Sequence, residues 1–157
     1  MVGLDASLVL CYRDEYATIL GDNRGDFEVL VAHEWLEDQP FKQTVFEPTP
    51  AYTLLSHCSE TTSLPHSANI WQGIFSRVGL LLKPQATGCC GMAGTYGHEV
   101  QNQENSRTLY ELSWQQPVQH TDPSRLLATG FSCRSQVKRY AQFKPKHPIE
   151  VLANVLS

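Results

Sequence analysis

The 157-residue sequence contains no long apolar run, no excess of positive charge and no leader-like start. A membrane-spanning helix needs roughly 18–20 consecutive apolar residues, so the absence of such a run argues against a transmembrane segment. Residues 1–5 lack the basic and apolar regions of an export signal, which predicts a reducing, cytoplasmic location. The formal net charge of −4 disfavours nucleic acid as a partner, because nucleic acid generally binds a basic surface.

Two common catalytic patterns are also missing. No Gly-Lys-Ser or Gly-Lys-Thr is present, which excludes a P-loop, and the absence of Gly-x-Ser-x-Gly argues against a serine hydrolase. The hydrophobic share of 41% and the charged share of 18% are instead ordinary for a globular protein. A chain of this length buries roughly 68–70% of its unfolded surface, so it needs no disulfides to fold.

Short apolar segments alternate with segments of helical spacing along the chain. The pattern predicts strands at residues 8–12, 52–55, 80–82 and 126–131. Helices are predicted at residues 13–21, 65–78, 99–115, 133–140 and 148–156, the third of them with Leu109, Leu112 and Trp114 facing inward. Residues 27–36 are compatible with either type, and residues 39–50, with three prolines, indicate a loop. This alternation predicts an α/β fold, mainly a parallel sheet of about four strands flanked by helices.

Four of the five cysteines follow predicted strands, namely Cys58, Cys89, Cys90 and Cys133. The carboxyl ends of parallel strands meet at one edge of a sheet, so we expect these thiols to gather there. Four thiolates are the ligand set of a [4Fe–4S] cluster or of a structural zinc ion. Cys11 lies inside a predicted buried strand instead, where a cysteine behaves as a small apolar residue.

The double cysteine belongs to a loop at residues 88–97 in which every third residue is glycine. Glycine lets the backbone turn tightly and approach a ligand, and exposed amides there can donate to sulfur. A disulfide between Cys89 and Cys90 is a weaker alternative, because it requires strained geometry and an oxidising compartment. Chance clustering of buried thiols remains a further alternative.

Three histidines and a basic segment have both a functional and an ordinary interpretation. His57, His98 and His147 are candidates for ligands or for donors to a bound group, but capping and packing explain them as well. The cations at positions 134, 138 and 139 form either a solvated face or a docking surface for an acidic partner. Tyr110 and Trp114, four residues apart, are explained by core or partner packing.

The loop sequence Gly-Cys-Cys-Gly-Met-Ala-Gly-Thr-Tyr-Gly, with His-Cys-Ser-Glu at 57–60 and Thr-Gly-Phe-Ser-Cys-Arg-Ser-Gln at 129–136, resembles a cysteine-rich CCG domain. Such domains occur in heterodisulfide reductase and in the iron–sulfur subunits of glycolate and lactate oxidases. The sequence is more similar to the carboxyl-terminal end of large FAD- and iron–sulfur-containing D-2-hydroxy-acid dehydrogenases, whose substrates include D-2-hydroxyglutarate, D-lactate and glycolate. The resemblance covers nearly the whole chain.

This resemblance implies that residues 51–157 form the CCG domain and residues 1–50 a lead-in segment packed on it. Cys58, Cys89, Cys90 and Cys133 would bind an iron–sulfur cluster, most simply [4Fe–4S]. Heterodisulfide reductase has Cys-x-x-Cys at the last motif, whereas this chain has Gln136 at the second position, which leaves four thiolates for a single cluster.

The resemblance also implies a function and partners. The domain would pass electrons from a flavin to an acceptor, with no catalytic residue of its own. FAD and further iron–sulfur domains would lie upstream in a longer parent chain, in the cytoplasm or at the membrane periphery through the acceptor. A structural zinc module and a metal-free interaction domain are the alternatives.

Overall fold

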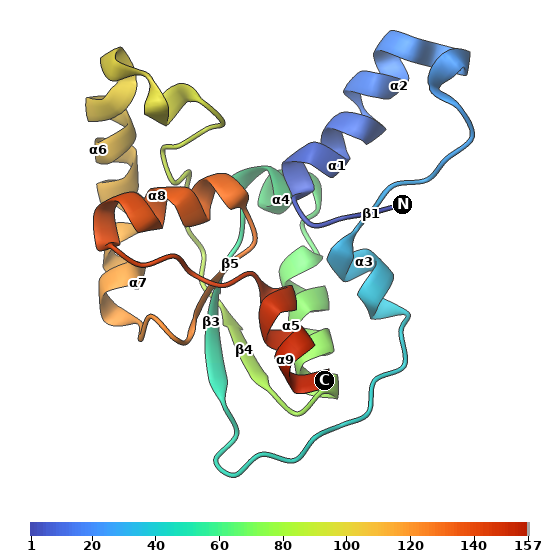
Figure 1. Ribbon diagram of the computed structural model, residues 1–157, viewed down its shortest axis with the longest axis vertical. Helices are drawn as coiled ribbons and strands as arrows, with labels where there is room; N and C mark the ends of the chain where they lie inside the picture. Colours follow the sequence, from blue (N-terminus) through green and yellow to red (C-terminus); the bar gives the residue numbers. More distant parts are fainter. Residues whose placement is uncertain (157) are drawn as a thin grey trace.

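The computed structural model describes residues 1–156, in which helices and strands alternate along the chain (Figure 1). The elements are β1 Val2–Gly3, α1 Ala6–Arg13, α2 Glu15–Leu20, η1 Gly21–Arg24, β2 Leu30–Val31, α3 Ala32–Glu37, β3 Ala51–Leu55, α4 Cys58–Ser63, α5 Ser67–Arg77, β4 Leu81–Pro84, η2 Tyr96–His98, η3 Val100–Asn102, α6 Gln103–Ser113, α7 Gln115–His120, β5 Leu126–Ala128, α8 Phe131–Ala141 and α9 Pro148–Leu156.

The central sheet has the strand order β4-β3-β5, and both pairs of neighbours are parallel. Tyr52 is opposite Leu82, and Leu54 is opposite Leu127. A second small parallel sheet joins β1 to β2. The predicted α/β class and parallel pairing are therefore confirmed, and the three strands of the central sheet were all predicted.

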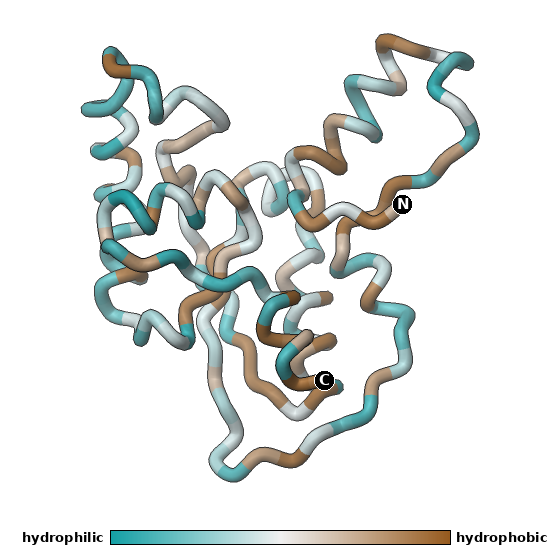
Figure 2. Tube along the Cα trace, viewed as in Figure 1, coloured by the Kyte–Doolittle hydropathy of each residue, from teal (hydrophilic) through white to brown (hydrophobic). Residues whose placement is uncertain are grey.

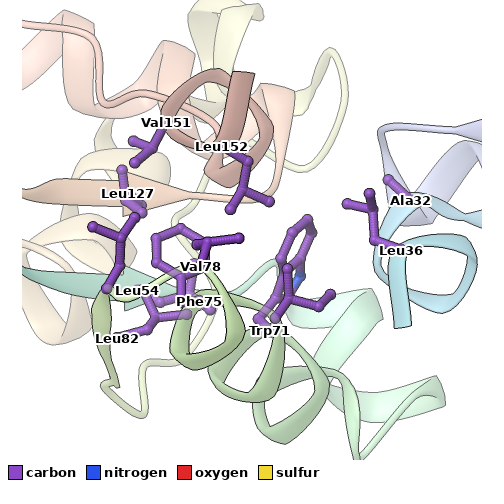
Figure 3. Close-up of a cluster of buried hydrophobic side chains, with 12 residues drawn as sticks. Ala32, Leu36, Leu54, Trp71, Phe75, Val78, Leu82, Leu127, Val151 and Leu152 are labelled. Atoms are coloured by element: carbon purple, nitrogen blue, oxygen red, sulfur yellow. The ribbon is translucent and has the colours of Figure 1, made fainter. Parts of the chain in front are cut away.

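One face of the central sheet is covered by α5 and α9. Leu54, Leu82 and Leu127 point to this face and are at most 2% exposed. The buried stripe of α5 packs on them together with the apolar side of α9 and two residues of α3 (Figure 3). The buried residues of α5 are Ser67, Trp71, Ile74 and Phe75, and those of α9 include Val151 and Leu152.

The opposite face is covered by α6, α7 and α8. Leu55, Leu126 and Ala128 alternate with the residues of the first face, because successive side chains of a strand point to opposite sides. They pack with the aromatic and aliphatic residues of the three helices, and this cluster also contains Cys90 and Cys133. Two of the cysteines are therefore part of the hydrophobic core between the sheet and α8.

The prediction of a strand at residues 8–12 was wrong, because this segment belongs to α1. A short apolar run does not distinguish strand from helix. The deciding local signal is Asp5, whose side chain caps the helix by accepting from the backbone amide of Ser7 at 3.1 Å. Cys11 is consequently half-buried on a helix, and its predicted place in a buried strand was wrong as well.

The inward face of α6 also differs from the prediction. Leu109 is 39% exposed and Leu112 is 76% exposed, whereas Tyr110 and Trp114 are buried. A face of period 3.6 that contains Tyr110 and Trp114 places Leu112 on the opposite side of the helix.

Helices α4 and α7 were not predicted, and residues 38–50 form no helix or strand, in agreement with the predicted loop. No helix within residues 1–156 is long and apolar enough to cross a membrane.

Candidate functional site

The four candidate cysteines come from the carboxyl-end loops of the three parallel strands. Cys58 follows β3 as the first residue of α4, and Cys89 and Cys90 lie in the loop after β4. Cys133 follows β5 in the first turn of α8. Because the strands are parallel, these loops all lie at the same edge of the sheet (Figure 1).

The thiols lie close enough to influence one another. Cys90 and Cys133 form one hydrogen-bonded pair, and Cys89 interacts with Cys58. The charge of each of the other three thiols also acts on Cys133. Cys90 and Cys133 are buried, whereas Cys58 and Cys89 are partly exposed, so one side of the group is dry and the other meets solvent.

Backbone amides of the glycine loop are directed at the sulfur atoms. The amide of Gly91 donates to Sγ of Cys89 at 3.4 Å, and the amides of Met92 and Ala93 point to the thiol of Cys90. Gly91 and Ala93 both have positive φ, at 84° and 42°. Such a turn gathers successive N–H groups on its concave side, where they stabilise negative charge.

These contacts separate the pKa values of the buried pair. The hydrogen bond from Cys133, together with the loop amides, lowers the pKa of Cys90 to about 7. The same bond and burial raise the pKa of Cys133 well above its usual value. Burial raises the pKa of Cys89. Of Cys89, Cys90 and Cys133, Cys90 is therefore the one that most readily becomes a thiolate, which is the form of cysteine that binds metals.

Helix α6 and the residue after it hold the loop in place. The indole Nε1 of Trp114 donates to the carbonyl of Gly88 at 2.9 Å, and the hydroxyl of Ser113 donates to the carbonyl of Cys89 at 3.2 Å. At Gly91 an added Cβ would come within 2.2 Å of the carbonyl oxygen of Ser106, so only glycine permits this close approach. The glycine spacing read from the sequence thus has a physical reason at this position.

A buried polar network connects the loops after β3 and β5. Glu60, 1% exposed, accepts from Nε1 of Trp71 at 3.2 Å and from the hydroxyl of Thr129. Thr129 in turn accepts from the backbone amide of His57 at 2.9 Å. Burial raises the pKa of Glu60. Glu60 and Thr129 both belong to the motifs of the family resemblance, but no local pattern in the sequence indicates their contact, which spans 69 positions.

The three candidate histidines have different surroundings. His57 caps α4 by accepting from the amide of Ser59 at 3.2 Å, and its ring lies against Gly130, near Cys133. His98 is exposed and contacts the guanidinium of Arg139 at 3.0 Å. His147 is buried, where its Nδ1 accepts from the amide of Ile149 at 3.2 Å. Capping and packing thus account for His57 and His147.

The side chains at this site are of the type that binds a metal ion or an iron–sulfur cluster through thiolates. Four thiols converge from three loops, with amides directed at two of them. Within residues 1–156, no three His, Cys, Asp or Glu side chains are arranged to hold a single metal ion. The direct thiol contacts are those of Cys58 with Cys89 and of Cys90 with Cys133, and Cys58 and Cys89 also act on Cys133 through their charge.

Comparison with known proteins confirms the resemblance to D-2-hydroxy-acid dehydrogenases. The chain is 49% identical to D-2-hydroxyglutarate dehydrogenase of Escherichia coli (strain K12) over 160 residues, and 51% identical to that of Pantoea ananatis (strain AJ13355) over 158 residues. Each match covers 99% of this chain and 15% of the relative, in its carboxyl-terminal part. The chain thus spans about 15% of the length of these relatives.

A more distant relative is one of the subunits of the anaerobic glycerol-3-phosphate dehydrogenase of Escherichia coli (strain K12). It is 23% identical over the whole of this chain and 40% of its own length. No protein-family profile matches the chain, and no solved structure matches it.

Proposed function

We propose that this chain is the iron–sulfur electron-transfer domain of a larger FAD-dependent D-2-hydroxy-acid dehydrogenase. D-2-hydroxyglutarate is the proposed substrate of the whole enzyme, because the relatives of about 50% identity are named for it. The flavin site would lie in the part of the parent protein that corresponds to the remaining length of these relatives. In this assignment the chain carries electrons between that flavin and an acceptor, with the cytoplasm as its proposed location.

The observation that carries the proposal is the gathering of Cys58, Cys89, Cys90 and Cys133 at one sheet edge. In ligand type the four thiols fit both a [4Fe–4S] cluster and a structural zinc ion. The similarity to proteins named as dehydrogenases supports the redox-active cluster over the structural ion.

The residues of the chain supply what such a group requires. The four thiolates would bind it, and when bound it supplies reversible one-electron transfer. The amides of Gly91, Met92 and Ala93 stabilise negative charge on sulfur and so favour the bound, ionised thiols. Met92 and Trp114, each at most 1% exposed, exclude water from the inner side of the site.

Electron transfer of this kind requires no catalytic acid, base or nucleophile in this domain. The partly exposed side at Cys58 and Cys89 offers the shorter path to an electron partner, because the other two thiols lie under α8 and the sheet. The chain's contribution to the reaction is thus to bind and shield the redox group and to keep one side of it near the surface.

The test is metal and sulfide analysis of protein purified or reconstituted without oxygen. We expect about four iron and four sulfide per chain, with a visible absorption that bleaches on reduction. Cys90→Ser and Cys133→Ser should lower both contents, whereas Cys11→Ser, which removes a free thiol outside the site, should leave them unchanged. One zinc per chain without sulfide would establish the structural-zinc alternative. No metal after reconstitution, with all variants alike, would establish the metal-free interaction domain.

A further inference from the structure

The segment formed by α2 and η1 contains no buried residue. It extends α1 away from the rest of the molecule (Figure 1). We refer to residues 14–28, which comprise these two elements and their flanks, as the arm. Isolated helices shorter than roughly 12–15 residues are marginal in water, and α2 has only six. A helix this short that buries nothing within its own chain therefore needs a partner surface to be stable.

The exposed side chains of the arm are of two kinds. Ile19 is 77% exposed, Tyr16 40% and Leu20 39%, and the apolar tip is visible in brown in Figure 2. Around them the arm carries the exposed acids Asp14, Glu15, Asp22, Asp26 and Glu28. The arm's single cation, Arg24, lies over the ring of Phe27 at 5.3 Å. The arm thus presents apolar side chains surrounded by negative charge.

A surface of opposite character lies at the start of α8. Phe131 is 59% exposed, and its ring has Nζ of Lys144 at 5.1 Å and the guanidinium of Arg134 at 5.9 Å. The amide of Phe131 donates to Asp5 at 2.9 Å, which brings the start of α1 beside it. There Leu4, the residue before Asp5, is 56% exposed.

We call this group the Phe131 surface. It consists of Leu4, Phe131, Arg134, Lys138 and Lys144. Lys138 is exposed and lies four residues after Arg134, on the same face of α8. Arg134 pairs with Glu150 at 3.3 Å, so Lys138 and Lys144 carry most of the free positive charge.

Charge along the chain is strongly segregated between these two regions. Six of the twelve Lys and Arg residues lie between positions 125 and 146, and no Asp or Glu occurs between Asp122 and Glu150. The arm, by contrast, has five acids and one Arg. The overall charge of −4 hides this separation. Opposite potentials on two apolar surfaces are the pattern of complementary interfaces.

The arm cannot reach the Phe131 surface of its own molecule. That surface lies at the start of α1, and the arm follows the end of α1. The helical run from Ala6 to Leu20 spans roughly 20 Å at 1.5 Å per residue, and it leads the arm away from Phe131. Contact between the two complementary surfaces therefore requires two molecules.

We propose that the arm of one copy docks on the Phe131 surface of a second copy, and that the exchange is reciprocal. Ile19 and Leu20 lie against Phe131 and Leu4 of the partner, and the arm's carboxylates face Lys138 and Lys144. A reciprocal exchange forms a closed dimer with a two-fold axis, which is the commonest symmetry of soluble oligomers. It buries both short helices and leaves neither complementary surface open.

The interface lies beside the cysteine site, because Phe131 is two residues before Cys133. Dimerisation is nevertheless independent of any metal at the cysteines. The oligomeric state is measured separately from iron and sulfide content, so either proposal can fail while the other stands.

The first test is sedimentation equilibrium of the wild-type chain and of two matched variants. We expect a concentration-dependent dimer that weakens as salt is raised, because the facing charges are screened. Ile19→Ser should weaken dimerisation at least roughly tenfold, since it removes the central apolar side chain of the arm. Val100→Ser is the control, because Val100 is exposed to a similar extent, at 83% against 77% for Ile19, but lies on neither surface. A monomer at all concentrations, or equal effects of the two variants, overturns the proposal.

The second test exchanges the charges. Asp22→Lys with Asp26→Lys, or Lys138→Glu with Lys144→Glu, should each weaken the dimer. The chain that carries all four changes should dimerise about as well as the wild type, because attraction is restored with the signs reversed. Lys42→Glu with Lys83→Glu is the control for a change of net charge at exposed sites elsewhere. If the fourfold variant dimerises as weakly as either double variant, the arm does not bind the Phe131 surface. Binding of the arm to a different protein, with no dimer formed, also overturns the proposal.

Discussion

The hydroxyl of Thr129 donates a hydrogen bond to the buried carboxyl group of Glu60 and thereby joins the loop after β5 to the start of α4. The same hydroxyl oxygen accepts from the backbone amide of His57 at 2.9 Å. Cys58 follows His57, and Cys133 lies four residues after Thr129. The distance between these two cysteines therefore depends on a short polar connection in the core.

Removing that connection should destabilise the protein. Thr129→Val keeps the shape of the side chain but leaves the Glu60 carboxyl group and the His57 amide without one partner each. We expect a loss of about 2–3 kcal/mol in the free energy of unfolding, measured by urea denaturation. Thr129→Ser retains the hydroxyl and is the control, with an expected loss of less than about 1 kcal/mol. Equal stability of Thr129→Val and the wild type would show that the connection contributes nothing.

Two glycines of the cysteine loop form a matched pair. Gly91 (φ 84°) and Gly94 (φ 65°) both have left-handed backbone conformations. At Gly94 an added Cβ meets nothing within 4 Å, but at Gly91 it would lie 2.2 Å from the carbonyl oxygen of Ser106. Gly94→Ala should therefore cost only the conformational strain of about 1–2 kcal/mol.

Gly91→Ala adds a backbone clash to the same strain. It should be the more destabilising by at least about 1 kcal/mol, and it should displace the amides that point at Cys89 and Cys90. Thermal unfolding of both variants measures the difference. If reconstitution succeeds, Gly91→Ala should also bind less iron than Gly94→Ala. Equal unfolding temperatures would show that the loop does not depend on this close approach.

The free energy of unfolding should decrease as pH is lowered from 6.5 to 4, because His147 takes up a proton when the chain unfolds. Burial lowers the pKa of His147 to about 4, from an ordinary value of 6.5. In this range the unfolded chain binds a proton that the folded chain does not, so acidification favours unfolding. The contribution is present above pH 6.5, decreases as pH falls to about 4, and amounts to at most about 3 kcal/mol.

His147→Asn separates this titration from the cap. The Asn oxygen can still accept from the amide of Ile149, but it does not titrate. The variant should lose only part of the acid-dependent decrease, because burial also lowers the pKa of His33 to about 4 and lowers that of His57, and the contributions of these two histidines remain. Urea unfolding at pH 7 and pH 4.5 measures the decrease. An unchanged decrease would show that His147 is protonated without unfolding.

Metal loading should raise the unfolding temperature. A ligand that binds the folded chain more tightly than the unfolded one adds its binding free energy to folding. We expect protein reconstituted without oxygen to unfold at a higher temperature than the same protein after chelation. Cys133→Ser should abolish this difference, and Cys11→Ser should preserve it. A difference that persists in Cys133→Ser would place the metal elsewhere.

Several local features could be predicted from the sequence because they rest on neighbouring residues. The alternation of apolar runs with helical spacing predicted all three strands of the central sheet, and with them the common edge for four cysteines. The same reasoning failed at residues 8–12, where five apolar residues are compatible with both strand and helix. It failed again at Leu112, because a helix with apolar residues on more than one face does not reveal which face is buried.

The sequence by itself determined the cysteine loop, since its glycines, cysteines and strand-end position are local properties of the chain. Tertiary structure alone decided which thiols pair, that Glu60 and Thr129 connect two of the loops, and that the acidic arm projects away from the basic start of α8. Each of these depends on contacts between residues far apart in the chain. Such contacts result from the packing of the helices on the sheet, and local patterns in the sequence do not predict them.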